Sequence, residues 1–338
     1  MEAYYHQRLS RPQQAAYHAM KTGFAALSPR FSVPRLENQV LSDLFFQLRL
    51  DCPEIFYVTG FSYRFAPGAE SVELLPEYLF DKGKIRDHQR ALAARVEKLC
   101  RPARALSDWD KERYIHDFLC ENVRYDKLKK PYSHEIIGPL GQGVGVCEGI
   151  AKTVKLLCDT LGLWCVIAVS DAAPEAGVKY RHAWNIVRLD GQSYHLDATF
   201  DNSLGQGGAL RYDYFNLDDQ RLFRDHQPAL YPLPPCRDGG RFYYKEKKLS
   251  LTKVEEVCKR AQMPLRKGQT FVFHWRGGPL TREVLGELVR ALEETAQTRG
   301  RHAALSFNYP QAVLSVRFPA ELPREELVAQ EANEGESE

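Results

Sequence analysis

The chain has 338 residues, of which 44% are apolar and 27% charged, and its formal net charge is +2. A chain of this size and composition buries a core large enough to need neither disulfides nor a structural metal. Positive and negative side chains are interspersed, which excludes a basic stripe for nucleic acid. Residues 1–20 contain no continuous apolar run, and no later stretch reaches the ~20 apolar residues of a transmembrane helix. We therefore expect neither a signal peptide nor a membrane anchor, and a cytoplasmic protein whose eight cysteines are reduced thiols.

The first part of the chain, residues 1–105, alternates helical and strand patterns. Apolar residues recur at helical spacing in some segments, and aromatic and β-branched residues dominate others. In chain order we expect helices over 13–22 and 36–50, a pair of strands over 52–65 and 71–80, and a helix over 84–106. Ser107 then has the residue type of an N-cap, so a further helix should run from there to Val123.

A Gly-rich segment leads into a helix that begins near Cys147. Its apolar residues Ile150, Val154, Leu157 and Leu161 form one buried stripe, which Cys147 continues at the N-terminal end. Free backbone N–H groups and the helix dipole favour a thiolate at that position. The dipole is worth roughly 0.3 to 2 kcal/mol, which lowers the pKa of a thiol by about one unit. A cationic histidine is also needed before the thiolate dominates at neutral pH.

Two strands that follow, over 180–189 and 192–200, supply that histidine. The dipeptide Asp190-Gly191 between them favours a two-residue hairpin turn. In the register that this turn sets, His182 and Asp197 are diagonal neighbours on one face, roughly 7–8 Å apart between backbones. A slip of one residue would move Asp197 to the opposite face, so the prediction depends on the turn.

A cysteine, a histidine and an aspartate in this arrangement suit nucleophilic catalysis. The thiolate attacks an acyl carbon, the imidazole holds and delivers the proton, and the carboxylate fixes the imidazole tautomer. His195 shares the face of the hairpin and is a rival base, and His134, in the loop before the helix, is a weaker one. The backbone N–H of Cys147 can stabilise the oxyanion. Gln142 and Tyr125 are both chemically suitable as a second oxyanion donor, with a slight preference for Gln142.

Beyond residue 240 short strand and helix patterns alternate. The expected elements are strands over 241–246, 269–275, 302–308 and 312–318 and helices over 251–261 and 281–296. They outline a small α+β domain over residues 241–320. Residues 321–338 are polar and acidic, and we expect this tail to be disordered.

Four sequence blocks stand in a specific order: GVCEG, RHAWNIV, YHLDATFDN and YFNLDDQRLFRDH. Over about residues 105–226 they resemble bacterial proteins of the transglutaminase-like superfamily. The resemblance implies an α+β, papain-like core over 106–240, in which a Cys helix packs on an antiparallel sheet, with residues 1–105 as an N-terminal extension. It matches Cys147 to the nucleophile, His182 to the base and Asp197 to the third member of the triad.

The resemblance implies an enzyme that acts on amide or peptide bonds of a protein or peptide substrate through a Cys thioester, without cofactor or metal. We expect hydrolysis, as in a cysteine peptidase or a deamidase, because water is always available. The alternatives are a transamidating cross-linker and a catalytically silent scaffold that binds a protein partner through its C-terminal domain. The oxyanion tryptophan of animal transglutaminases has no clear counterpart, since Trp109 lies far upstream, and the CxxC zinc pairs of peptide N-glycanases are absent.

Overall fold

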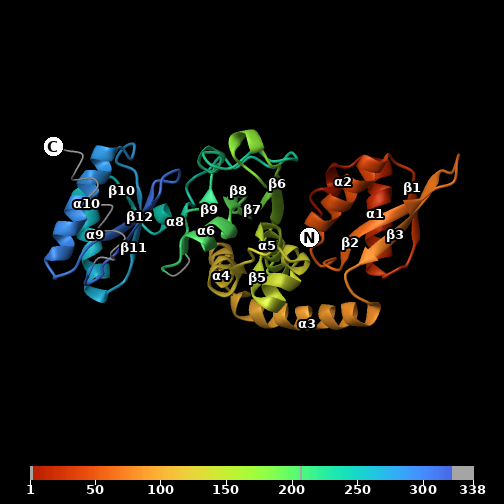
Figure 1. The fold of residues 1–338 in the computed structure, drawn as a ribbon, viewed down its shortest axis with the longest axis horizontal. Helices are drawn as coiled ribbons and strands as arrows, with labels where there is room; N and C mark the ends of the chain where they lie inside the picture. The colour runs from red at the N-terminus through yellow and green to blue at the C-terminus, as the bar shows by residue number, and fades with distance from the viewer. Residues whose placement is uncertain (1–2, 206–207, 322–338) are drawn as a thin grey trace.

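A computed structural model of the chain describes residues 3–205 and 208–321. Its helices and strands gather into three parts along the long axis, each with a β-sheet of its own (Figure 1). The N-terminal part is drawn in red and orange, the central part in yellow and green, and the C-terminal part in blue. The protein therefore has the mixed α+β architecture that the sequence predicts.

The N-terminal part is a three-stranded antiparallel sheet with two helices. Its elements are α1 (Arg11–Ala25), β1 (Phe31–Pro34), α2 (Asn38–Asp51), β2 (Val58–Arg64) and β3 (Ser71–Tyr78). The strands lie in the order β1-β3-β2. Strand β1 was not predicted, because four residues with one buried side chain carry no detectable alternation. Before α1, a short 3-10 turn (His6–Arg8) follows Tyr5, whose hydroxyl donates to the carbonyl of Ile167 at 2.5 Å and ties this end of the chain to the central sheet.

Two helices connect this part to the central one. Helix α3 (Lys82–Cys100) runs along one edge of the molecule, from the N-terminal part to the central part (Figure 1). It ends before the predicted residue 106, because Pro102 lies in a separate 3-10 turn (Arg101–Ala103). Helix α4 (Asp108–Asn122) begins as predicted, with the Ser107 hydroxyl accepting a hydrogen bond from the Asp110 N–H at 3.2 Å.

The central part places helix α5 on an antiparallel sheet. Its elements are β4 (Arg124–Tyr125), the short helices η3 (Pro131–His134) and η4 (Gly138–Gln142), β5 (Val144–Gly145), α5 (Cys147–Thr160), β6 (Cys165–Ser170), η5 (Pro174–Ala176), β7 (His182–Leu189), β8 (Gln192–Leu196), α6 (Ala198–Gly205), β9 (Phe215–Leu217) and α7 (Asp219–Leu222). The sheet has the order β6-β7-β8-β9. The predicted apolar stripe of α5 is buried in the main hydrophobic cluster.

The predicted hairpin register is confirmed. Asp190 and Gly191 have φ values of 49° and 79°, and Leu189 pairs with Gln192 across the turn. The prediction of a strand as far as residue 200 is wrong, however, because β8 stops at Leu196 and α6 follows. Asp197 causes the change: its Oδ1 accepts hydrogen bonds from two backbone N–H groups of the first turn of α6, at 2.9 and 3.0 Å.

The C-terminal part is a four-stranded sheet covered by two helices. Its elements are α8 (Tyr243–Glu246), β10 (Ser250–Leu251), α9 (Val254–Lys267), β11 (Phe271–Trp275), α10 (Arg282–Gln297), β12 (Ala304–Asn308) and β13 (Val313–Arg317), with the strand order β10-β11-β13-β12. The predicted strand over 241–246 is wrong. Tyr243 and Tyr244 belong to the short helix α8, and Phe242 precedes it. Tyr243 stacks on Tyr212 with 3.6 Å between ring centroids, so these aromatic residues reflect packing and not strand pairing.

The hydrophobic clusters do not coincide with these three parts. One cluster lies within residues 251–318, whereas the main cluster spans the N-terminal and central parts together and also includes Phe242, Tyr244 and Val313. The predicted domain boundaries therefore stay predictions, and nearly all of the predicted acidic tail lies outside the described residues. Within residues 3–205 and 208–321, no helix combines the length and the apolar character needed to cross a bilayer.

Candidate active site

Cys147 is the first residue of α5 and is partly exposed. The loop that ends at Glu135 lies directly against this first turn, since a Cβ atom at Gly149 would stand only 2.2 Å from the carbonyl oxygen of Ser133. Gly149, the last residue of the sequence block GVCEG, thus permits close approach of two backbones. This contact fixes the start of the helix, and with it the thiol.

A cavity of about 350 Å³ opens at the thiol. Its wall combines residues from the N-terminal part, the loops before α5 and two strands of the central sheet. The lining residues are Phe46, Tyr125, Lys129, His134, Val146, Cys147, Glu148, Val169, Tyr180, Arg181, His182 and Ala183. Apolar and aromatic side chains predominate, and Lys129 and Arg181 add positive charge.

His182, the first residue of β7, lies between the thiol and a carboxylate. Its Nε2 donates to Asp197 Oδ2 at 2.5 Å, and it has a hydrogen-bonding contact with Cys147. Burial lowers the pKa of His182, but the charge and hydrogen bond of Asp197 and the neighbouring thiol outweigh burial and raise that pKa to about 10. The structure therefore brings Cys147, His182 and Asp197 together in the predicted order.

Asp197 is fully buried and has four hydrogen-bond donors. Oδ1 accepts hydrogen bonds from two backbone N–H groups of α6. Oδ2 accepts hydrogen bonds from His182 Nε2 and from His226 Nε2, the latter at 2.9 Å. Burial alone would raise the pKa of Asp197, but the two imidazoles hold it well below its usual range. The carboxylate is thus ionised and cannot rotate without losing bonds on both oxygens.

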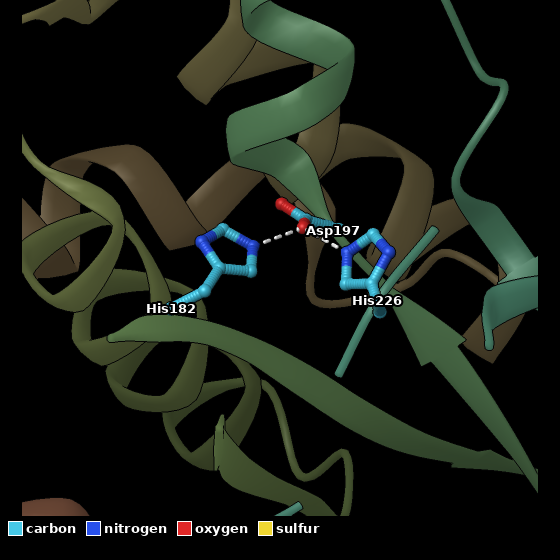
Figure 2. A group of neighbouring side chains, drawn as sticks. All are labelled: His182, Asp197 and His226. Carbon is cyan, nitrogen blue, oxygen red and sulfur yellow. Dashed lines mark hydrogen bonds and ion pairs between the residues drawn. The ribbon is translucent and has the colours of Figure 1, made fainter. Parts of the chain in front are cut away.

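His226 is the one member of this cluster that sequence reasoning missed. Figure 2 shows it on the opposite side of Asp197 from His182, with both rings directed at the same carboxylate oxygen. Its Nδ1 is bonded to Asp225 Oδ1 at 2.8 Å. The residue ends the fourth sequence block, YFNLDDQRLFRDH, which was the available signal, but no strand pattern or turn fixes the position of this loop.

The two rival histidines have other partners. The Trp184 Nε1 donates to His195 Nδ1 at 3.1 Å, and His195 Nε2 is bonded to Asp219 Oδ1 at 2.9 Å. Both ring nitrogens of His195 are therefore engaged away from the thiol. His134 lines the cavity and bonds to Glu148 Oε2 at 3.3 Å.

The two candidate oxyanion donors are placed differently. Tyr125 lines the cavity, and burial, followed by the neighbouring Cys147, raises the pKa of its phenol, so its hydroxyl stays a donor. Gln142 is exposed in η4 and is not among the described residues that line the cavity. Trp109 packs against Phe215 with 5.7 Å between ring centroids.

Glu148, next to the thiol, belongs to a buried charge network. Its Oε1 lies 2.8 Å from Lys152 Nζ and 3.6 Å from Arg49 Nη2, and Arg49 and Lys152 also pair with Glu135. Burial alone would raise the pKa of Glu148, but the positive charge of Lys152 outweighs burial and holds that pKa well below its usual range. Because Arg49 belongs to α2, this network joins the N-terminal part to the start of α5.

Two groups of described residues bring three metal-ligating side chains within reach of one ion: His182, Asp197 and His226, and His195, Asp219 and Cys236. In the second group the indole N–H of Trp184 requires His195 Nδ1 to be an acceptor, so Nε2 carries the proton that Asp219 accepts. In the first group both Nε2 atoms face Asp197. Hydrogen bonding accounts for both groups, and we assign a metal to neither.

Comparison with known proteins adds the family. Residues 67–198 match the family model for the transglutaminase-like superfamily. The chain contains a transglutaminase-like domain. The matched range includes Cys147, His182 and Asp197 and ends before His226.

No curated protein matches the sequence. Among solved structures, the chain is similar to a TGase, at 13% identity over 50% of this chain and 51% of that chain, with a TM-score of 0.29. It is similar to a proposed cysteine protease from Cytophaga hutchinsonii, at 13% identity over 41% of this chain and 61% of that one, with a TM-score of 0.26. A proposed protease from Parabacteroides distasonis also has 13% identity, over 42% of this chain and 37% of that one, with a TM-score of 0.24. The chain thus spans less than two thirds of each of these proteins.

Proposed function

We propose that the protein is a thiol acyl-transfer enzyme with Cys147 as nucleophile, His182 as base and Asp197 as the group that orients the histidine. The observation that carries this proposal is the unbroken set of contacts from Cys147 through His182 to a fully buried Asp197, at the wall of an open cavity. Since Nε2 of His182 is bound to Asp197, Nδ1 is the nitrogen left for the thiol. A site of this composition suits attack on an acyl carbon.

The reactive form would be a thiolate–imidazolium pair, in which His182 holds the proton and Cys147 has given its proton up. The Cys147 thiolate adds to the amide carbonyl carbon, and the C=O electron pair moves to the oxygen. As the oxyanion collapses, the C–N bond breaks and His182 gives its proton to the leaving amine, which leaves a thioester on Cys147. Water then attacks the thioester with His182 accepting its proton, and the acid and the free thiol are released. An amine in place of water would give transamidation.

The oxyanion needs two donors in this scheme. The backbone N–H of Cys147, at the start of α5, is one of the groups that have no partner within the helix. For the second donor we now prefer the Tyr125 hydroxyl to Gln142, because Tyr125 lines the cavity that contains the thiol. The Tyr125→Phe variant should then lose turnover while Gln142→Ala keeps it.

We propose hydrolysis of an amide or peptide bond in a protein or peptide substrate, in the cytoplasm and without nucleic acid as a partner. The mostly apolar cavity wall favours an acyl group with an apolar neighbour. A silent scaffold that uses the domain over 241–320 for a protein partner is the alternative. The buried Asp197 and its four donors are more than a scaffold requires.

The test is the pH dependence of iodoacetamide labelling at each cysteine, read by mass spectrometry. We expect Cys147 to label selectively at a pH well below that at which ordinary thiols react, and His182→Ala to remove this selectivity. Cys158 and Cys165, both buried in α5 and β6, serve as internal controls. Labelling of Cys147 with the pH profile of an ordinary thiol in folded protein would favour the scaffold.

A further inference from the structure

One carboxylate oxygen in the site accepts hydrogen bonds from two histidines. Asp197 Oδ2 is bonded to His182 Nε2 at 2.5 Å and to His226 Nε2 at 2.9 Å (Figure 2). The proposed mechanism uses only His182. The second imidazole is buried against the same atom, with 5.3 Å between the centroids of the two rings, and therefore needs a role of its own.

Both ring nitrogens of His226 face carboxylates. Nε2 is bonded to Asp197 and Nδ1 to Asp225 Oδ1, at 2.9 and 2.8 Å. A neutral imidazole has a single N–H, so its bare nitrogen would set a lone pair against a carboxylate oxygen. Only the imidazolium satisfies both contacts. Burial lowers the pKa of His226, but the two carboxylates outweigh burial and raise it.

Asp225 is itself held as an acceptor from two sides. The Tyr214 hydroxyl donates to its Oδ2 at 2.6 Å, and Gln311 Nε2, in the turn between β12 and β13, lies 3.4 Å from the same oxygen. Imidazole and carboxylate side chains therefore alternate along a row that starts beside the Cys147 thiol and runs through His182, Asp197 and His226 to Asp225. The other titratable groups close to His226 are His195 of β8 and Tyr214, which precedes β9.

We propose that His226 is a positioning residue which, as a buried imidazolium, holds Asp197 toward His182 and sets the pH range in which the Cys147–His182 pair is reactive. A nearby positive charge favours the deprotonated form of every acid around it, the thiol included. With His226 charged, the thiolate and imidazolium pair forms at lower pH than Asp197 and His182 alone would allow. This inference rests on the proposed function.

The test separates the charge of His226 from its hydrogen bond. In His226→Gln the side-chain amide can still donate to Asp197, but it carries no charge. We expect the acid limb of the Cys147 labelling profile to move to higher pH by about one unit, in protein whose thermal unfolding shows it to be folded. The matched control is His195→Gln, the same change at a buried histidine with other partners, which should leave the limb in place. An unmoved limb in His226→Gln, or an equal movement in both variants, would overturn the proposal.

A second measurement needs no variant and decides the matter if His226→Gln does not fold. Long-range ¹H–¹⁵N spectra of the full-length wild-type protein, with His226 assigned through its backbone, should show protons on both ring nitrogens at neutral pH. One bare ring nitrogen would contradict the imidazolium and the proposal with it. Failure of the proposed function is recognised separately, since wild-type Cys147 would then label like any other thiol whatever the state of His226.

Discussion

The Nζ atom of Lys152 lies 2.8 Å from Oε1 of Glu135, and neither side chain has more than slight access to solvent. Lys152 also neutralises Glu148, beside the candidate nucleophile. The Lys152→Met variant would leave two acidic groups with only Arg49 as a buried partner, and we expect it to lower the free energy of unfolding by about 3–5 kcal/mol in urea titrations. Arg90→Ala removes an exposed ion pair with Asp87 and should cost at most about 1 kcal/mol. Equal losses in the two variants would contradict the role of the network.

Asp197 and His182 should make stability depend on pH in both directions. The pKa of Asp197 is below its usual 3.8 in the folded state, so its contribution is present above that value and is lost as the pH falls. The pKa of His182 is raised from 6.5 to about 10, so its contribution is fully present below 6.5 and is lost as the pH rises through about 10. We therefore expect Asp197→Asn to be most destabilising, by about 3 kcal/mol or more, near pH 6. The measurement is a denaturant titration of wild type and Asp197→Asn at acid, intermediate and alkaline pH. A difference in the free energy of unfolding that stays constant over these pH values would contradict the prediction.

Glu112 offers an independent pH test away from the site. It is fully buried in α4, with Asn216 donating to one oxygen at 2.9 Å, and burial raises its pKa to about 8. A carboxyl group whose pKa is raised on folding destabilises the folded state at high pH. In the unfolded chain the group ionises freely there, whereas in the folded protein it must either carry a buried charge or keep a proton. Glu112→Gln should therefore raise the melting temperature at alkaline pH and have little effect near pH 5. A variant that melts lower at alkaline pH would contradict this prediction.

The position of Phe46 in the cavity wall predicts a preference for acyl donors with an apolar side chain. Its ring lines the cavity from α2, with the Arg181 guanidinium 5.6 Å from the ring centroid. Peptidyl chloromethyl ketones that differ only in an apolar or a glycine side chain should label Cys147 at different rates, and Phe46→Ala should reduce that ratio about ten-fold. Phe65→Ala, at an exposed phenylalanine after β2, is the control. A ratio that both variants leave unchanged would show that Phe46 does not contact the acyl group.

His195→Ala should largely spare Cys147 labelling and turnover, whereas His182→Ala should abolish the reactivity of the thiol. The reason is the Trp184 indole, which holds His195 toward Asp219. Comparison of the two variants by labelling rate and by circular dichroism separates loss of a base from loss of fold. Equal loss of reactivity in two folded variants would refute His182 as the sole base.

The hairpin and the candidate triad could be predicted because local chemistry specifies them. Asp190-Gly191 adopts the positive φ values of a tight turn, and this sets the register that brings His182 near Asp197. The end of β8 is not predicted, for a reason equally local: the strand pattern includes Asp197, although its side chain caps α6. One aspartate thus ends a strand, begins a helix and binds two histidines.

Long-range placements could not be predicted in this way. His226 reaches Asp197 through a loop whose path depends on contacts with Gln311, and Arg49 reaches Glu148 across about a hundred positions of sequence. No periodicity or turn signal in the sequence indicates contacts between residues that lie so far apart along the chain. Aromatic composition was likewise misleading at α8, where Tyr243 is used for stacking.

The cavity wall contributed by Phe46 bears on how the protein can be divided. The range that matches the superfamily contains all three candidate catalytic residues, yet a fragment cut to that range would lack Phe46 and Arg49 on one side and His226 on the other. Such a fragment would keep the nucleophile and lose both the shape of its pocket and the counter-charges that surround it. If the proposed function holds, the active unit is therefore larger than the range that matches the family, and we expect a fragment cut to that range to keep Cys147, His182 and Asp197 but to lose the reactivity of the thiol.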